Sequence, residues 1–308
     1  MRRKEKNRIL KEIAVEDYAA EGKSIARVEG KVIFIEGAVP GDRVDIRLSK
    51  SKKDWAEGKA IFFHEYAQKR TTPFCDHFGI CGGCKWQMLP YEDQLNYKDK
   101  EVAAHLKRIG KIDLPAPFPI AGASETRYYR NKLEFTFSNR RYLTQEEMEV
   151  FKKTDAGIEA FPQEPALGFH VPGYFDKVVN IESCHLQPEP SNAIRNFIRR
   201  YALKNNLSFY NIRAHEGWLR TMIVRTSSLG EVMVNVVFGY DAAEERDKLL
   251  GALQEAFPEI TTILYTINPK KNDSIHDLEP QIFWGSGYIA EQLENFTFKI
   301  GPKSFFQT

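Results

Sequence analysis

The stretch "SIARVEGKVIFIEGAVPGDRVDIRLS", residues 24–49, decides the predicted fold of the first part of the chain. Two runs that alternate apolar and polar residues flank Gly30, whose tolerance of positive φ suits a hairpin turn. Pro40 and Gly41 suit a second turn, and a third alternating run follows it. Short strands with regularly spaced turns are typical of a small β-barrel, which we expect over residues 1–66.

The composition excludes several classes of protein. The 308 residues are 42% hydrophobic and 28% charged, which is typical of a globular chain, and the net charge of +2 argues against a histone-like nonspecific binder. No apolar run reaches the roughly 18 residues needed to cross a bilayer, and the charged N-terminus has no secretory signal. We therefore predict a cytoplasmic protein with no membrane partner.

The rest of the chain predicts further elements. Residues 91–110 have the pattern of an amphipathic helix with an apolar stripe that includes Val102 and Ile109, and a Pro-rich linker follows. From residue 120, strands and helices alternate in an order that favours helices packed on a mixed sheet. Residues 139–165 are polar and predict an exposed excursion, and Ser191 is the expected N-cap of a later helix.

Three of the four cysteines lie within ten residues. Cys75, Cys81 and Cys84 have the spacing Cys-x5-Cys-x2-Cys, and Cys184 is about a hundred residues away. Disulfides are rare in the cytosol, so a cluster of this kind indicates metal binding or redox chemistry. Four thiolates suit an iron–sulfur cluster or structural zinc, and the spacing alone leaves both open, together with reactive thiols.

The ordered motifs resemble a known family. Residues 22–48 resemble a TRAM domain, an OB-like barrel that binds RNA, and "RTTPFCDHFGICGGCKWQMLPYEDQLNYKDKEV" at 70–102 resembles the signature of the RNA (uracil-5-)-methyltransferases. "YRNKLEF" at 129–135, "ALGFH" at 166–170 and "VVNIESCHLQP" at 178–188 also look like family segments. The resemblance implies S-adenosylmethionine-dependent methylation of uridine C5 in 23S rRNA or tRNA. It also implies a [4Fe–4S] cluster on the four cysteines.

The end of the chain resembles another family motif. "SFFQT" at 304–308 looks like the Phe-Phe-Gln motif that opens the Rossmann-like catalytic domain, and the resemblance implies that Gln307 contacts S-adenosylmethionine. We therefore expect a chain truncated before that domain, with the Rossmann-like domain absent and no catalytic residue present. On this prediction the chain is the RNA-recognition portion of the enzyme and is inactive by itself.

The predicted organisation has four parts. They are an OB-like TRAM barrel at 1–66, an iron–sulfur segment with a helix and linker at 67–119, a central α/β domain with a mixed sheet at 120–303, and the start of the missing domain at 304–308. RNA contact needs cations for phosphates and planar groups for unstacked bases. The candidate RNA-binding residues are Lys50, Lys52, Lys53, Trp55, Arg127, Arg130, Asn131 and Lys132.

Phe34 and Phe62 are expected in the barrel core rather than against RNA. A stand-alone RNA-binding protein with a structural metal is the alternative to the methyltransferase. An electron-transfer protein is disfavoured, because one cluster with a distant ligand on so large a chain is unlike a ferredoxin. The family resemblance leads us to expect a monomer.

Overall fold

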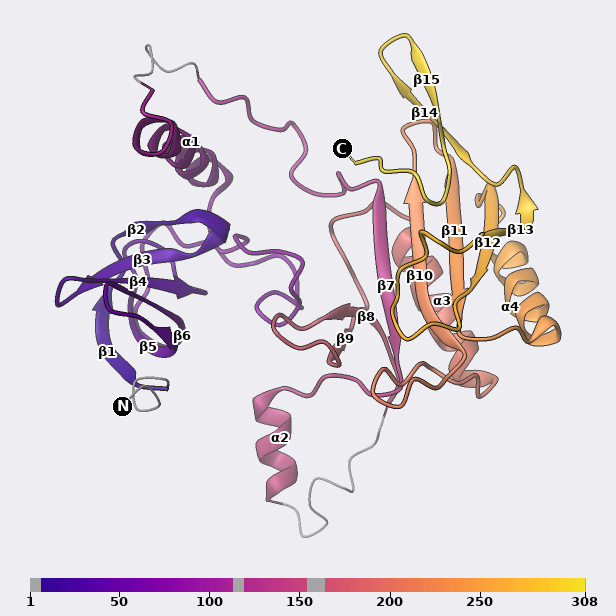
Figure 1. The fold of residues 1–308 in the computed structure, drawn as a ribbon, viewed down its shortest axis with the longest axis horizontal. Helices are drawn as coiled ribbons and strands as arrows, with labels where there is room; N and C mark the ends of the chain where they lie inside the picture. The colour runs from indigo at the N-terminus through magenta and orange to yellow at the C-terminus, as the bar shows by residue number, and fades with distance from the viewer. Residues whose placement is uncertain (1–6, 113–118, 154–163, 308) are drawn as a thin grey trace. The chain divides into compact units, whose positions relative to one another are not determined.

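The computed structural model describes residues 7–112, 119–153 and 164–307 (Figure 1). The chain divides into two compact units. The N-terminal unit is Met1–Gly79 with Cys84–Thr126, and the central unit is Ile80–Gly83 with Arg127–Thr308. The cysteine segment predicted at 67–119 therefore contributes residues to both units.

The N-terminal unit contains a six-stranded sheet in the order β1-β5-β6-β4-β3-β2. Only the β4–β6 pair is parallel. The edge strands β1 and β2 are consecutive in the chain, with only Val15 and Glu16 between them, so the sheet curls into a barrel. The strands are β1 Ile9–Ala14, β2 Asp17–Tyr18, β3 Ser24–Val28, β4 Lys31–Glu36, β5 Arg43–Ser51 and β6 Trp55–Glu65.

Alternation along the strands builds the barrel core. Ile33 and Ile35 of β4 and Val44 and Ile46 of β5 are fully buried in one apolar cluster. Their sequence neighbours point to the other face, because successive side chains of a strand alternate. The three strands predicted within residues 24–49 are confirmed, as is the positive φ of Gly30 at the first turn.

Helix α1, Tyr91–Arg108, confirms the helix predicted after the cysteine segment, but its predicted apolar stripe was wrong. Val102 and Ile109 are 57% and 77% exposed. The helix instead packs Tyr97 into a small cluster with Val39 and Met88, because an amphipathic face can be aromatic rather than aliphatic. The predicted Pro-rich linker at 111–123 lies partly outside the described residues.

The central unit contains a seven-stranded mixed sheet in the order β13-β12-β11-β10-β7-β8-β9, with only β11 and β12 parallel. A separate hairpin, β14–β15, follows it. The strands are β7 Lys132–Ser138, β8 Ala166–His170, β9 Val178–Asn180, β10 Leu219–Thr226, β11 Val232–Phe238, β12 Thr262–Ile267, β13 Gln281–Gly285, β14 Ile289–Leu293 and β15 Phe296–Ile300.

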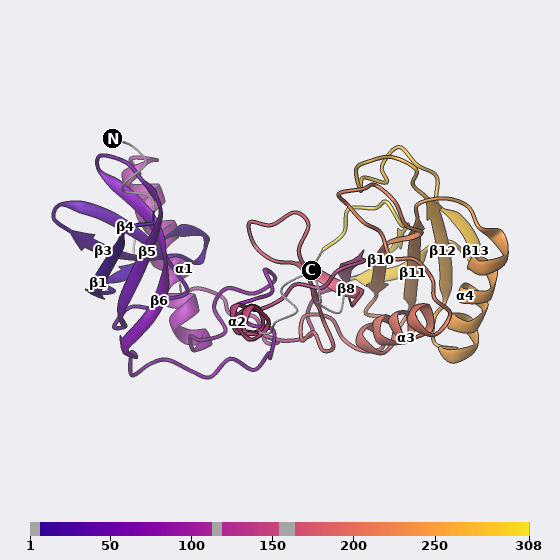
Figure 2. The same cartoon turned by 90° about the horizontal axis from the view of Figure 1, so that it is seen from below.

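Helices α3, Ser191–Lys204, and α4, Ala243–Ala256, cover one face of this sheet (Figure 2). Ile198 of α3 and Leu250 of α4 are fully buried in the same core as the inward residues of the strands. The prediction for Ser191 was wrong: it is the first helical residue, and its hydroxyl donates to Gln187 Oε1 at 2.6 Å instead of capping the helix.

Residues 139–165 include a helix that the polar composition did not predict. Helix α2, Gln145–Lys152, begins with a capping box in which Thr144 and Glu147 each accept a hydrogen bond from the other's backbone N–H. The Thr-x-x-Glu pattern is a sequence signal for a helix start, which the polar composition of the segment obscured. Part of this predicted excursion, residues 154–163, lies outside the described residues.

Candidate nucleic-acid interface

The predicted RNA-binding residues of the N-terminal unit gather at the β5–β6 hairpin. Lys50 is the next-to-last residue of β5, Lys52 and Lys53 lie in the turn, and Trp55 is the first residue of β6. The backbone N–H of Lys52 donates to the carbonyl of Trp55 at 2.8 Å, which holds the turn. Lys50 Nζ lies 4.7 Å from the centroid of the Trp55 ring, a cation–π contact. The hairpin therefore presents an ammonium and a flat ring together.

The aromatic surface extends from this hairpin to β4. The rings of Phe34 and Trp55 have centroids 6.3 Å apart and meet edge to face. The expectation that Phe34 and Phe62 belong to the barrel core was wrong. Phe34 is only partly buried, and Phe62 is 56% exposed. Phe34 occupies a position whose neighbours along β4, Ile33 and Ile35, fill the core.

The second predicted group lies in the central unit at the start of β7. The N–H of Arg130 donates to the carbonyl of Leu186 at 2.7 Å, which ties the segment before β7 to the loop after β9. Lys132 forms an ion pair with Glu134 at 3.7 Å. Asn131 is 8% exposed, and its Nδ2 has no hydrogen-bond partner among the described residues.

Arg127 belongs to the same segment, so the structure brings this group together within one unit. The lysine and tryptophan group belongs to the other unit. Whether both groups contact one RNA stays a prediction.

The four cysteines are divided between the units. Cys75 and Cys84 belong to the N-terminal unit, and Cys81 and Cys184 belong to the central unit. In the central unit, Cys81 packs against the apolar core that contains Cys184. Cys81 Sγ accepts a hydrogen bond from the N–H of Gly83 at 3.4 Å, the kind of contact that stabilises a thiolate.

Cys184 lies near a buried cation. The N–H of Cys184 donates to Asn192 Oδ1 at 2.8 Å, and the same oxygen accepts from the buried guanidinium of Arg195. Burial lowers the pKa of Arg195 to about 10, an effect opposed by the charges of Cys184, Glu189 and Glu182. A cation held in this position would stabilise an anionic sulfur ligand.

An assembled metal centre is not visible in the part of the chain that the structure describes. There, no three His, Cys, Asp or Glu side chains lie together in a way that could hold a metal ion. The thiols are chemically suited to iron or zinc, but their gathering is not observed. The [4Fe–4S] cluster therefore stays a prediction from the sequence.

Gln307 is exposed near the end of the central unit. The segment before it is fixed: Arg225 donates to the carbonyl of Ser304, and Phe306 packs against a cluster that includes Met233. Burial lowers the pKa of Arg225. The assignment of Gln307 to S-adenosylmethionine stays a prediction.

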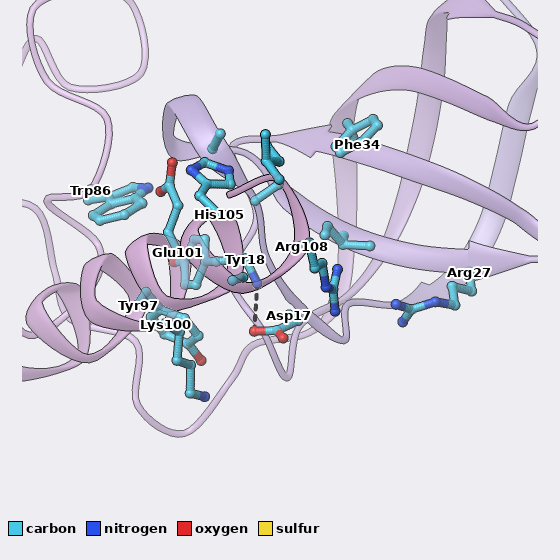
Figure 3. A pocket seen from close by; sticks show the side chains of 15 residues that line it. Asp17, Tyr18, Arg27, Phe34, Trp86, Tyr97, Lys100, Glu101, His105 and Arg108 are labelled. Carbon is cyan, nitrogen blue, oxygen red and sulfur yellow. Dashed lines mark hydrogen bonds between the residues drawn. The ribbon is translucent and has the colours of Figure 1, made fainter. Parts of the chain in front are cut away.

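A cavity of about 360 Å³ in the N-terminal unit is lined by residues that the sequence did not predict as a site (Figure 3). Tyr97, Lys100 and Arg108 line it from α1, and Tyr18 and Trp86 line it from β2 and the cysteine segment. The signal was present on the helix, since positions 97, 100, 104 and 108 recur at helical spacing. No pattern in the sequence joined them to Tyr18 or Trp86.

Comparison with known proteins places these features in context. The family model for the TRAM domain matches residues 5–61. An uncharacterized RNA methyltransferase of Bacteroides thetaiotaomicron is 50% identical over 293 residues, 94% of this chain and 63% of that protein. A protein of the same description from Porphyromonas gingivalis is 45% identical over 296 residues, 96% of this chain and 63% of that protein.

A solved structure shares the fold. The crystal structure of Pyrococcus abyssi tRNA (uracil-54, C5)-methyltransferase in complex with S-adenosyl-L-homocysteine superposes with a TM-score of 0.63 at 23% sequence identity. The match covers 96% of this chain and 61% of that one. This chain thus spans 61–63% of the length of these proteins, so activity, substrate and partners are matters of proposal.

These matches correct the prediction of a truncated, inactive recognition portion that lacks the Rossmann-like domain. Proteins named RNA methyltransferases match over 94–96% of the chain. This similarity does not mark the chain as a recognition portion distinct from the enzyme. Nor do the matches show the Rossmann-like domain to be absent, so that part of the predicted fold class is withdrawn.

None of the helices in the described ranges combines the length and apolar character needed to cross a bilayer. The barrel of the N-terminal unit coincides with the TRAM match. Residues 5–61 thus match the TRAM domain model, and almost all of the chain is similar to proteins named RNA methyltransferases.

Proposed function

We propose that the protein is an S-adenosylmethionine-dependent RNA methyltransferase that modifies C5 of uridine in tRNA or 23S rRNA. The observation that carries the proposal is 50% identity to an RNA methyltransferase over 94% of the chain. The TRAM match and the exposed aromatic and basic surface of the barrel support RNA as the substrate. A cytoplasmic location and a monomeric state belong to the same proposal.

Within this proposal the predicted residues take specific roles. Lys50, Lys52, Lys53 and Trp55 contact the RNA through phosphates and one stacked base. Arg127, Arg130 and Lys132 contact the backbone from the central unit. Asn131 positions that segment, because it is buried and its backbone carbonyl accepts a hydrogen bond from the N–H of Thr226 at 2.9 Å.

Gln307 contacts the methyl donor, and the four cysteines hold a [4Fe–4S] cluster. Methyl transfer changes no oxidation state of uracil, so a cluster would serve structure rather than redox chemistry. Its Cys ligands would stabilise the fold in the way that a structural zinc site does.

The test is methyl transfer to RNA from cells in which the gene has been deleted, because that RNA carries the unmodified target. The protein is incubated with methyl-labelled S-adenosylmethionine, and the RNA is digested to nucleosides. We expect the label in 5-methyluridine. Label in another nucleoside would overturn the assignment to uracil C5. RNA binding without any transfer would favour the stand-alone RNA-binding protein.

A further inference from the structure

The cavity in the N-terminal unit has no role in the function proposed above. It lies between the outer face of β2–β4 and helix α1, with Trp86 at one end (Figure 3). Its volume of about 360 Å³ is at the small end of the range for ligand sites, on the scale of one nucleotide. Four aromatic residues line it, from separate segments of the chain: Tyr18, Phe34, Trp86 and Tyr97.

The aromatic wall is held in place by packing. The ring centroids of Tyr18 and Tyr97 are 4.2 Å apart, and those of Tyr18 and Trp86 are 5.2 Å apart. Tyr18 and Tyr97 also pack against buried Met88 and Leu89. A wall fixed in this way offers flat surfaces without the entropy cost of ordering flexible side chains.

Two polar atoms of this wall lack partners. Tyr18 Oη and Trp86 Nε1 are buried and have no hydrogen-bond partner in the described part of the chain. Burial is the largest cause of the raised pKa of Tyr18, so its phenol stays protonated and able to donate. Buried donors are nearly always satisfied, so two unpartnered donors on rings that line one cavity are unusual.

The charged residues that line the cavity are Arg27, Lys100 and Arg108, together with the acidic Asp17 and Glu101. Lys100 and Arg108 are exposed on α1, and in the described residues neither has a carboxylate within ion-pair distance. Lys100 Nζ lies 5.1 Å from the Tyr97 ring centroid. Arg27 lies on β3 and already forms an ion pair with Glu16 at 2.5 Å. Two cations therefore remain available to phosphates beside an aromatic cavity.

The cavity is continuous with the predicted RNA-binding hairpin through one side chain. Phe34 lines the cavity, and its ring lies 6.3 Å from the centroid of Trp55, over which Lys50 Nζ sits. Rings and ammonium groups thus alternate from α1 across β4 to β6. Proteins that bind single strands use this combination, because bases stack on rings while cations follow the backbone.

We propose that the cavity holds one unstacked base of single-stranded RNA, with the flanking phosphates against Lys100 and Arg108 and the following base against Phe34 and Trp55. This inference rests on RNA being the substrate of the protein, as proposed above. It adds a base-binding site on α1 and β2–β4. A duplex does not fit the site, because its bases are stacked and paired.

The first experiment measures binding of a fluorescein-labelled single-stranded RNA of about ten nucleotides by anisotropy, over a range of salt concentrations. The double variant Lys100→Ala/Arg108→Ala is compared with Lys98→Ala/Lys107→Ala, whose exposed lysines lie on α1 but do not line the cavity. We expect the cavity variant to reduce the slope of log K against log salt by about 1.4, or roughly 0.7 for each phosphate contact. An equal effect of both double variants would overturn the proposal.

The second experiment tests the base that follows the one in the cavity, which the proposal places against Phe34 and Trp55. Abasic sites are introduced one at a time along the same RNA, and each is measured with the wild type and with Phe34→Ala. Removing one stacking ring costs about 5- to 150-fold in affinity. We expect at least one position where the abasic site weakens wild-type binding but has little further effect in Phe34→Ala. Independent effects at every position would exclude contact of Phe34 with a base.

The two proposals fail in different ways. In one outcome, the protein methylates natural RNA, and the cavity variants bind and react like the wild type. That outcome would overturn the base site and leave the enzyme assignment intact. Oligonucleotide binding with the expected variant effects, but no methyl transfer to any RNA, would overturn the enzyme assignment and leave the base site intact.

Discussion

Asp42 joins the barrel to the segment that leads to the cysteines, and its replacement by asparagine gives a sharp test of the N-terminal unit. The residue is 1% exposed. Its Oδ2 accepts from the N–H of Val39 at 2.8 Å and from Arg70 at 2.7 Å, and its Oδ1 accepts from the N–H of Ala67 at 2.9 Å. All three partners are donors, so both oxygens must accept.

An asparagine side chain cannot meet this demand, because it has one acceptor oxygen and one donor NH2 group. In either orientation the NH2 group faces at least one N–H donor. Each buried hydrogen bond left unmade costs about 1–3 kcal/mol, and the bond to Arg70 loses its charge assistance. Arg70 is 19% exposed and regains some hydration. We therefore expect Asp42→Asn to lower the free energy of unfolding by about 2–4 kcal/mol.

The assay must report on this unit alone, because a chain with two units need not unfold in one step. Hydrogen exchange at the amides of Val39 and Ala67, followed as urea is raised, gives a local free energy of opening. Asp54→Asn, in the exposed β5–β6 turn, is the matched control and should change stability by less than about 0.5 kcal/mol. Unchanged exchange at both amides in Asp42→Asn would refute the account of the junction.

Three further predictions concern the barrel, the RNA surface and the cysteines. Gly58→Ala places a Cβ 2.6 Å from Ile46 Cγ2 and 2.7 Å from the Arg47 carbonyl, so we expect a loss of at least about 1–3 kcal/mol in thermal unfolding. Gly251→Ala, on α4 with open space around it, should instead stabilise by about 0.5–1 kcal/mol, and the opposite order would contradict the packing. Lys50→Ala should weaken RNA binding and reduce its salt slope by about 0.7, while an unchanged slope would mean that Lys50 contacts no phosphate. Anaerobically purified protein should contain about four iron and four sulfide ions per chain, with loss of both in Cys184→Ser; stoichiometric zinc without sulfide would contradict the cluster.

The sequence predicted those elements whose signals are local. Each strand within residues 24–49 needs only alternation and a turn residue, and the helices α3 and α4 need only an apolar stripe. The β14–β15 hairpin was not predicted. Leu293 and Phe296 are apolar residues of the kind expected in a core, but both are exposed. Local patterns specify an element's type better than they specify the face it buries.

The cavity could not be predicted for a different reason. Tyr18, Trp86 and Tyr97 are separated by up to 79 positions along the chain, and each taken alone resembles an ordinary core residue. Only the docking of α1 against β2–β4 brings them into one wall, and that docking depends on side-chain packing rather than on periodicity. Lys100 and Arg108 then lie beside the rings of Tyr18 and Trp86 as well as Tyr97 of their own helix.

For Phe34, the alternation of side chains along β4 was enough to predict that the ring points away from the core. In "VIFIE", Ile33 and Ile35 are the buried residues of β4, and a strand that turns these two inward must turn Phe34 outward. The expectation of a core phenylalanine weighed residue type above position, although a half-buried strand has only one inward face. An outward Phe beside an outward Trp55 exposes apolar surface that a solvated barrel does not need. The pleat explains why position 34 faces outward. The proposed stacking of a base on Phe34 would explain why an aromatic residue stands there.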